Sequence, residues 1–422
     1  MTYILTAPDK LNTTISLPAS KSISNRALIM HALSGGTLLP QNLSDCDDTA
    51  VMVDALQNMP PVIDIGAAGT AMRFLTAYLA VSGGTHIITG TERMKHRPIG
   101  VLVNALKRLG ADIAYEGTEG FPPLRITGKP LQGGTLEIAG NVSSQYISAL
   151  LMIGPTLKEG LTLRLRGDLI SRPYIELTLW MMRRFGADAE WTGADTISVR
   201  PKPYADCAYY IENDWSAASY WYEMVALSAD PDAEVRLCGL IDGSKQGDSV
   251  VRYIFSLLGV KTQFESKSED VLQTVTLRKS GLKSPHMEFD FTNAPDLAQT
   301  VVVSCCMMGV HFHFTGLSTL KIKETNRIEA LKRELRKLGY VLTDRDGSEL
   351  SWDGSRCEPV VTEAGGCEQR LTLIDTYEDH RMAMAFAPVS IVQAIGINEP
   401  QVVSKSYPAF WDDLKFSGFS IT

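Results

Sequence analysis

Four stretches of the chain share one pattern: apolar residues recur every three or four positions, a glycine follows, and apolar and polar residues then alternate. The first spacing predicts an amphipathic helix, the glycine its left-handed end, and the alternation a strand. The stretches are residues 101–115, 177–191, 250–264 and 328–342, with Gly110, Gly186, Gly259 and Gly339 at the joints. These glycines lie roughly 75 residues apart, too far for ankyrin or tetratricopeptide repeats, so each α+β repeat should hold several strands and more than one helix.

A domain boundary is expected near residue 212. Residues 200–206 contain two prolines, and residues 212–222 begin a new predicted helix with Asp214 or Ser216 as its N-cap. Two repeats lie on each side of this point, which predicts two similar domains with a cleft between them, where ligand sites often lie. Residues 298–320 carry no formal charge, but polar residues interrupt them too often for a membrane span, so they should form a buried helix and a strand.

Basic residues lie near the starts of several predicted helices, where the helix dipole disfavours them by about 0.3 to 1 kcal/mol each. A helix start that also carries cationic side chains suits a phosphate or carboxylate, because backbone N–H groups and side chains both donate to the anion. We therefore expect a ligand to supply the missing negative charge. The residues concerned are Lys21, Arg26, Arg73, Lys323, Arg327 and Arg381, with the neutral donors Ser143, Ser144 and Gln145 at a further helix start.

Composition narrows the class of protein. The chain has 422 residues, 40 Lys plus Arg against 48 Asp plus Glu, and a formal charge of -8, which argues against a nucleic-acid or anionic-membrane surface as the main function. Its first residues lack the basic segment and apolar run of a secretory signal, so a cytoplasmic location is expected. Reduced, structural thiols are expected because the seven cysteines, at positions 46, 207, 238, 305, 306, 357 and 367, contain no C-x-x-C pair.

Motif absences limit the anion. The sequence contains no G-x-x-x-x-G-K-[ST] loop, no G-x-G-x-x-G after a strand and no kinase motif, so small phosphorylated metabolites remain the favoured ligands. His311 and His313 alternate along a predicted strand and could both face a metal ion, but no third ligand stands at a supporting spacing. An ordinary strand is the preferred interpretation there.

The ordered motifs closely resemble those of the 5-enolpyruvylshikimate-3-phosphate (EPSP) synthases, enolpyruvyl transferases, over nearly the whole chain. The matching segments are residues 20–26 (SKSISNR), 68–73 (AGTAMR), 93–98 (RMKHRP), 143–145 (SSQ), 171–174 (SRPY), 295–296 (PD), 323–327 (KETNR), 379–384 (DHRMAM) and Lys405.

This resemblance implies an α/β fold with two domains, an inside-out α/β barrel with three βαβαββ units in each domain. One domain would comprise residues 21–211 and the other residues 1–20 with 212–422, with hinge crossovers near residues 20 and 212. The domains would close on the substrates, and the protein would be a monomer.

The resemblance also implies the reaction: the enolpyruvyl group of phosphoenolpyruvate moves to the 5-hydroxyl of shikimate 3-phosphate through a tetrahedral adduct that eliminates phosphate. This is a step of aromatic amino acid and chorismate biosynthesis, and it uses no metal or organic cofactor. The matching residues for phosphoenolpyruvate are Lys21, Gly69, Arg97, Gln145, Arg327, Arg381 and Lys405. Those for shikimate 3-phosphate are Lys21, Ser22, Arg26, Ser143, Ser144, Gln145, Ser171, Tyr174, Asp296 and Lys323.

Catalytic roles follow from the chemistry of these groups. Fixed cations must neutralise the carboxylate and phosphate of phosphoenolpyruvate while its vinyl carbon is protonated. Asp296 is expected to act as the base toward the hydroxyl, Glu324 to exchange a proton with the methylene carbon, and Lys21 to assist at the bridging or leaving oxygen. The alternative for Glu324 is a helix-start carboxylate that only pairs with its basic neighbours.

Four positions depart from the family pattern: Ala67, Phe74, Thr319 and Asn326. Ala67 and Thr319 each remove an amide contact, so substrate affinity and sensitivity to the family's inhibitor glyphosate can differ from the norm. Two alternative functions remain. One is the related UDP-N-acetylglucosamine enolpyruvyl transferase, whose mobile loop usually carries a cysteine that residues 93–98 lack. The other is a non-catalytic phosphometabolite sensor, which would need neither Asp296 nor Glu324.

Overall fold

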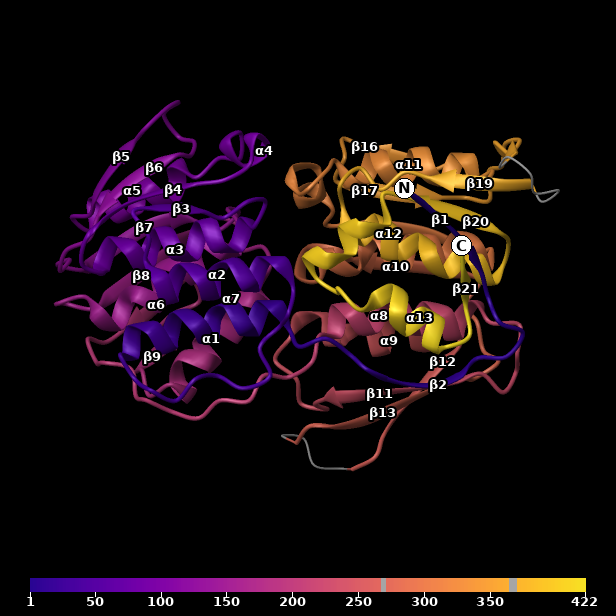
Figure 1. The fold of residues 1–422 in the computed structure, drawn as a ribbon, viewed down its shortest axis with the longest axis horizontal. Helices are drawn as coiled ribbons and strands as arrows, with labels where there is room; N and C mark the ends of the chain where they lie inside the picture. The colour runs from indigo at the N-terminus through magenta and orange to yellow at the C-terminus, as the bar shows by residue number, and fades with distance from the viewer. Residues whose placement is uncertain (267–270, 364–369) are drawn as a thin grey trace. The chain divides into compact units, whose positions relative to one another are not determined.

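The computed structural model describes residues 1–266, 271–363 and 370–422, so Cys367 lies outside the described residues. The chain divides into two compact units (Figure 1). Unit 1 consists of Met1–Pro18 and Glu212–Thr422, and unit 2 of Ala19–Ile211.

Unit 2 is built from two four-stranded sheets and the helices that connect their strands. Its helices are α1 (Lys21–Ser34), α2 (Asp47–Asn58), α3 (Gly69–Val81), α4 (Glu92–Lys95), α5 (Gly100–Arg108), α6 (Ser144–Ile153) and α7 (Arg172–Arg184). Its strands are β3 (Val62–Asp64), β4 (Thr85–Thr89), β5 (Asp112–Tyr115), β6 (Leu124–Thr127), β7 (Gly134–Ala139), β8 (Leu161–Arg166), β9 (Ala189–Trp191) and β10 (Thr196–Val199).

Unit 1 has three sheets over the described residues. Its helices are α8 (Trp215–Leu227), α9 (Val251–Ser256), α10 (Ala298–Met308), α11 (Arg327–Lys337), α12 (His380–Phe386) and α13 (Phe410–Phe416). Its strands are β1 (Thr2–Thr6), β2 (Asn12–Ser16), β11 (Glu234–Leu240), β12 (Val260–Phe264), β13 (Gln273–Lys279), β14 (His286–Asp290), β15 (His311–Thr315), β16 (Thr343–Arg345), β17 (Glu349–Trp352), β18 (Thr362–Glu363), β19 (Arg370–Ile374), β20 (Ile395–Asn398) and β21 (Ser420–Ile421).

One strand order recurs in the sheets. In β3-β4-β6-β5 the first two strands are parallel and joined through α3, the chain then passes through α4 and α5, and β5 and β6 form an antiparallel hairpin. The sheets β7-β8-β10-β9 and β14-β15-β17-β16 repeat this arrangement with their own helices. Each is a βαβαββ unit, so the α/β repeat expected from the sequence is confirmed.

The N-terminal strands complete two sheets of unit 1. β2 pairs in parallel with β11, so it supplies the first strand of the sheet whose other members come more than 200 residues later. β1 pairs with both β20 and β21, as Figure 1 shows beside the C-terminus, and it takes the place that β6 has in the first sheet. Both sheets therefore depend on pairing between distant parts of the chain.

In each βαβαββ repeat, the helix that follows the first strand is buried, whereas the second helix has one exposed face. In unit 1, α10 packs against both α8 and α12, and all seven residues of α12 are buried. In unit 2, α1, α3 and α6 contact one another in the same way. Each unit thus has its own apolar core around three inner helices with sheets outside, which is the inside-out architecture expected from the resemblance.

The four glycines singled out in the sequence all have left-handed backbones. Gly110, Gly186, Gly259 and Gly339 have φ of 99°, 82°, 81° and 90°. Each lies between an outer helix and the next strand. Gly418, with φ of 95°, occupies the same joint between α13 and β21, a copy that the sequence pattern missed because α13 has only seven residues.

No helix among the described residues is long and apolar enough to cross a membrane. The segment at residues 298–320 contains the buried helix α10 and the strand β15, as expected. Asp214 caps α8 by accepting a hydrogen bond from Ser216 N, which decides between the two candidate caps.

Candidate functional site

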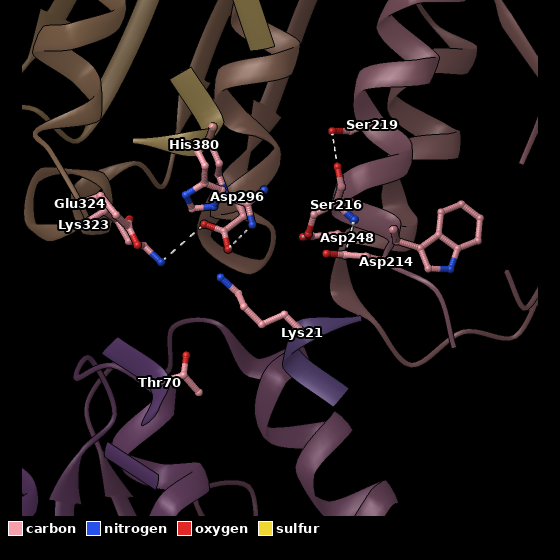
Figure 2. A network of polar contacts seen from close by, with 12 residues as sticks. Lys21, Thr70, Asp214, Ser216, Ser219, Asp248, Asp296, Lys323, Glu324 and His380 are labelled. Atoms are coloured by element: carbon pink, nitrogen blue, oxygen red, sulfur yellow. Dashed lines mark hydrogen bonds and ion pairs between the residues drawn. The ribbon is translucent and has the colours of Figure 1, made fainter. Parts of the chain in front are cut away.

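Asp296 is the centre of a dense ion-pair cluster in unit 1. It lies in the short 3-10 turn Pro295–Leu297 that leads into α10. Its Oδ1 accepts a hydrogen bond from Arg327 Nη1 at 3.1 Å, and its Oδ2 accepts one from Arg381 Nη2 at 3.0 Å. Lys323 Nζ lies 3.5 Å from Oδ1 (Figure 2). The beginnings of α10, α11 and α12 therefore bring their charged residues to one place.

Glu324 and Asp379 complete this cluster. Glu324 bridges two cations, with Arg327 Nη2 at 2.9 Å and Lys405 Nζ at 3.2 Å. Asp379 is fully buried and pairs with Arg327 Nε at 2.7 Å, while it also caps α12 by accepting from Arg381 N. The guanidinium of Arg327 is thus held by three carboxylates at once.

Burial alone would raise the pKa of Asp296, but the charges of Arg381, Lys323 and Arg327 outweigh burial and hold this pKa well below its ordinary value. Burial would lower the pKa of Arg327, but its three carboxylate partners raise it above the usual range. Asp296 and Arg327 are therefore both held in their charged forms, and each stabilises the charge of the other.

This arrangement corrects one expectation. From the sequence, a ligand was expected to supply the charge missing from the basic helix starts. In unit 1 the protein supplies most of that charge itself. Three carboxylates, Asp296, Glu324 and Asp379, face four cations, Lys323, Arg327, Arg381 and Lys405.

Unit 2 gathers cations and neutral donors at the beginnings of α1, α3 and α6. Lys21, the first residue of α1, pairs with Asp48 at 3.3 Å. Gln145 Nε2 donates to Thr70 Oγ1 at 3.1 Å and so ties α6 to α3. Ser143 caps α6 by accepting from Gln145 N. Three of the residues expected in the site are therefore held in place by contacts within unit 2.

Gly69 begins α3 beside two guanidinium groups. A Cβ placed on this residue would lie 2.7 Å from Arg97 Nη1 and 2.9 Å from Arg73 Nη1. Arg73 also donates to Gly69 O at 2.8 Å. The absence of a side chain at this position thus lets two cationic groups approach the start of the helix.

Arg26 is buried more deeply than its expected role in ligand binding suggests, with 2% of its surface exposed. Its guanidinium donates to Thr178, Ser148 and the carbonyl oxygens of Ser22 and Tyr174. Burial lowers its pKa to about 10. In this structure Arg26 therefore supports the backbone of two expected site residues from behind.

Three further expected residues lie at or near the beginnings of α6 and α7. Ser144 is the buried first residue of α6. Ser171 precedes α7 with φ of 53°, a left-handed backbone that is uncommon outside glycine, and Tyr174 lies in the first turn of that helix.

Two of the four departures have visible consequences. Phe74 is fully buried, and the guanidinium of Arg26 lies 5.3 Å from its ring centroid, so this aromatic ring packs against a buried cation. Asn326 caps α11 by accepting from Glu329 N. Ala67 is exposed, and the Thr319 hydroxyl is buried with no hydrogen-bond partner among the described residues.

Sequence reasoning missed several charged partners. Asp379 was seen only as part of a motif, although an acid directly before a helix is an N-cap signal. Asp48 and Asp248 were missed because nothing local connects them with Lys21 or with the cluster around Asp296.

His313 pairs with Glu349 at 3.0 Å, and over the described ranges no group of three or more His, Cys, Asp or Glu could hold a metal ion. The six described cysteines are free thiols.

Comparisons with known proteins agree with the resemblance. The family model of EPSP synthase (3-phosphoshikimate 1-carboxyvinyltransferase) matches residues 5–63 and 59–414. A 3-phosphoshikimate 1-carboxyvinyltransferase of Bacteroides fragilis is 57% identical over 422 residues, covering 100% of this chain and 99% of the relative. The Aliivibrio fischeri protein of that name is 36% identical and covers 96% of this chain and 97% of its own.

The fold is also shared with a solved structure. EPSP synthase from Acinetobacter baumannii superposes with a TM-score of 0.77 at 21% identity, covering 100% of this chain and 99% of the other. These relatives carry the name that the resemblance predicts, and not that of the UDP-N-acetylglucosamine alternative. The chain belongs to the EPSP synthase (3-phosphoshikimate 1-carboxyvinyltransferase) family.

Proposed function

We propose that this protein transfers the enolpyruvyl group of phosphoenolpyruvate to the 5-hydroxyl of shikimate 3-phosphate and releases inorganic phosphate. The observation that carries the proposal is the cluster in which Asp296 and Glu324 share the cations Lys323, Arg327, Arg381 and Lys405. Full-length similarity to enzymes named for this reaction supports it.

The reaction needs proton transfers at the hydroxyl oxygen and at C3 of phosphoenolpyruvate. The 5-hydroxyl oxygen attacks C2 of phosphoenolpyruvate as its proton leaves, and C3 gains a proton to become a methyl group. The tetrahedral adduct then loses phosphate from C2 and a proton from the methyl group, which restores the double bond. One base near the hydroxyl and one acid–base group near C3 are therefore required.

We assign the first role to Asp296 and the second to Glu324. Asp296 is kept in its ionised, proton-accepting form by Arg381, Lys323 and Arg327, and the same charges make it a weak base. Glu324 contacts Arg327 and Lys405, two residues that the resemblance assigns to phosphoenolpyruvate, so it belongs beside the anionic donor. Lys21 is proposed to assist at the bridging or leaving oxygen.

Unit 2 is proposed to bind anions. Its contribution would be cationic side chains, hydroxyl groups and the N–H groups at the beginnings of α1, α3 and α6. The proposed phosphoenolpyruvate residues here are Lys21, Gly69, Arg97 and Gln145, and those for shikimate 3-phosphate are Lys21, Ser22, Arg26, Ser143, Ser144, Gln145, Ser171 and Tyr174.

Phosphate release tests the proposal. With both substrates present, we expect phosphate at a rate that needs each of them. Release with UDP-N-acetylglucosamine in place of shikimate 3-phosphate would favour the related transferase. Tight binding of both compounds without release would favour a sensor.

The two compact units are proposed to be the two domains of the family, hinged near residues 20 and 212 and working as a monomer in the cytoplasm. Small-angle scattering should give a smaller radius of gyration when shikimate 3-phosphate and a phosphoenolpyruvate analogue are both present, because ligand affinity shifts the population toward the closed state. An unchanged radius of gyration would contradict domain closure, and a dimer detected by light scattering would contradict the monomer.

A further inference from the structure

Asp248 is a buried carboxyl group that the proposed mechanism does not use. It lies in the 3-10 turn Gly247–Val250 with 4% of its surface exposed. Its Oδ2 accepts a hydrogen bond from the Ser216 hydroxyl in the first turn of α8 (Figure 2). Its Oδ1 is buried and has no hydrogen-bond partner among the described residues. An orphaned carboxylate oxygen is costly, so its retention calls for an explanation.

The pKa of Asp248 depends on its burial and on charged groups of the elements around it. Burial and the negative charges of Asp296 and Asp214 raise the pKa of Asp248 to about 7, while Arg381 on α12 and the Ser216 hydroxyl oppose this shift. On the adjoining α9, Arg252 is paired with Asp242. Burial therefore contributes most to the raised pKa of Asp248, and Asp296 and Arg381 modify this pKa in opposite directions.

Arg381 connects Asp248 with the proposed chemistry. Its guanidinium donates to Asp296 at 3.0 Å and to the Tyr220 hydroxyl at 3.4 Å, and the charges of both Asp296 and Asp248 raise its pKa. When Asp296 accepts the proton of the attacking hydroxyl, Arg381 loses the charge of its carboxylate partner. A second carboxylate in the field of Arg381 can replace that charge.

We propose that Asp248 is a positioning residue, ionised before the reaction, whose carboxylate keeps a negative charge in the field of Arg381 when Asp296 becomes protonated during turnover. The proposal rests on the proposed function and adds a residue to it. Asp248 does not touch the reacting atoms. Because the charge of Asp296 raises the pKa of Asp248, neutralising Asp296 lowers that pKa and favours the ionised form of Asp248.

The kinetic test compares the wild type with Asp248→Asn, which keeps the shape of the side chain but never ionises. In the wild type, kcat should rise with pH around 7, where Asp248 gains its charge. In Asp248→Asn we expect kcat to fall about 3- to 30-fold, as is usual for residues coupled in one charged network, and the rise to disappear. The KM for phosphoenolpyruvate should change little, because Asp296 is still ionised before the reaction.

Two further variants keep the test decisive. Ser216→Ala removes a donor that lowers the pKa of Asp248, so it should move the rise in kcat to higher pH, and it is informative even if Asp248→Asn folds poorly. Asp242→Asn is the matched control. It changes an acid to an amide in the preceding loop, where Asp242 pairs with Arg252, and it should leave the pH profile of kcat unchanged. A profile of the same shape in all four proteins would overturn the inference.

A spectroscopic titration separates this inference from the proposed function. Carbon-13 NMR of labelled aspartate should show one carboxyl titrating near 7 that is missing in Asp248→Asn and titrates at lower pH in Asp296→Asn. If this coupling is present but the wild type releases no phosphate, the proposed function is wrong and the coupling stands. If the enzyme is active and Asp296→Asn leaves the titration of Asp248 unchanged, only the present inference is wrong.

Discussion

Units 1 and 2 share one repeat and both place polar groups at the beginnings of helices, yet the charges at these helix starts differ. At the beginnings of α10, α11 and α12, unit 1 has carboxylates interleaved with cations, and each cation has an acidic partner. At the beginnings of α1, α3 and α6, unit 2 has lysine, arginine, serine and glutamine, with Lys21–Asp48 as its ion pair at these helix starts over the described residues.

The difference shows how one scaffold can serve two tasks. A helix start suits an anion when donors predominate there, as in unit 2. Adding carboxylates, as in unit 1, provides groups that can exchange protons beside the cations. The comparison therefore supports the proposal that acid–base chemistry belongs to unit 1 and anion binding to unit 2.

The largest effect is expected when Glu324 of unit 1 is replaced by an uncharged residue. Glu324→Gln keeps the shape of the side chain but removes its proton transfer, so turnover should fall about 10² to 10⁴-fold. Steady-state phosphate release measures this change. The control is Glu329→Gln, a carboxylate of α11 that pairs with Lys332. Near-normal turnover of Glu324→Gln would mean that Glu324 only pairs with its neighbours.

Next in size is a change at the beginning of α3 in unit 2. Gly69→Ala would place a Cβ 2.7 Å from Arg97 Nη1, so this guanidinium must move. We expect the affinity for phosphoenolpyruvate to fall about 5- to 150-fold, the equivalent of roughly 1 to 3 kcal/mol. Glyphosate, the longer inhibitor, should lose more.

The control for Gly69→Ala is Gly83→Ala, where an added Cβ meets nothing within 4 Å. Inhibition constants and KM values for the three proteins decide the outcome. Equal losses for inhibitor and substrate, or a parent enzyme that glyphosate does not inhibit, would show that Gly69 does not discriminate between them.

Each unit also buries an ionisable group in its interior, and the two respond to pH differently. Burial lowers the pKa of Arg26 in unit 2 to about 10, so this residue stays charged at neutral pH. Burial raises the pKa of Glu223 in unit 1 well above its ordinary value. The unfolded chain releases the proton of Glu223 above about pH 4.3, while the folded chain retains it, so stability is lost as the pH rises from there.

Glu223→Gln should therefore be as stable as the wild type at pH 4 and more stable at pH 8, by about 1 to 3 kcal/mol, the usual cost of leaving a buried polar group uncompensated. Urea unfolding at both pH values measures the difference. In the control Glu329→Gln, which changes a partly exposed carboxylate, the difference in stability from the wild type should not depend on pH in this way. A constant difference between pH 4 and 8 would mean that Glu223 does not titrate on unfolding.

The smallest effect tests the shared repeat itself. Gly110 has φ of 99°, and a Cβ added there would meet nothing within 4 Å, so Gly110→Ala adds only backbone strain. We expect a loss of about 1 to 2 kcal/mol in the free energy of unfolding. Gly418→Ala in unit 1, where φ is 95°, should cost at least as much, because the added Cβ would also lie 3.3 Å from Pro8 Cβ. No loss at Gly110, with Gly83→Ala as the reference, would contradict the left-handed joint.

Local signals explain what the sequence could predict. The helix-glycine-strand joints, the Asp214 cap and the buried helix at residues 298–308 were predictable because periodicity and capping act within a few residues. The motifs around Asp296 and Glu324 were found by resemblance. Helix α13 has only seven residues, too few for its period to be seen, so the fifth helix-glycine-strand joint, at Gly418, was missed.

By itself, the sequence determined the α/β repeat, the family and most of the charged residues of the site, because these depend on local spacing and on motifs. Only the tertiary structure decided that β1 and β2 complete sheets formed by the last half of the chain, and that Asp48, Asp379 and Asp248 approach Lys21, Arg327 and the surroundings of Arg381. The physical reason is that charge pairing and burial act through space, so a residue's ionisation depends on neighbours that the chain brings together only when it folds.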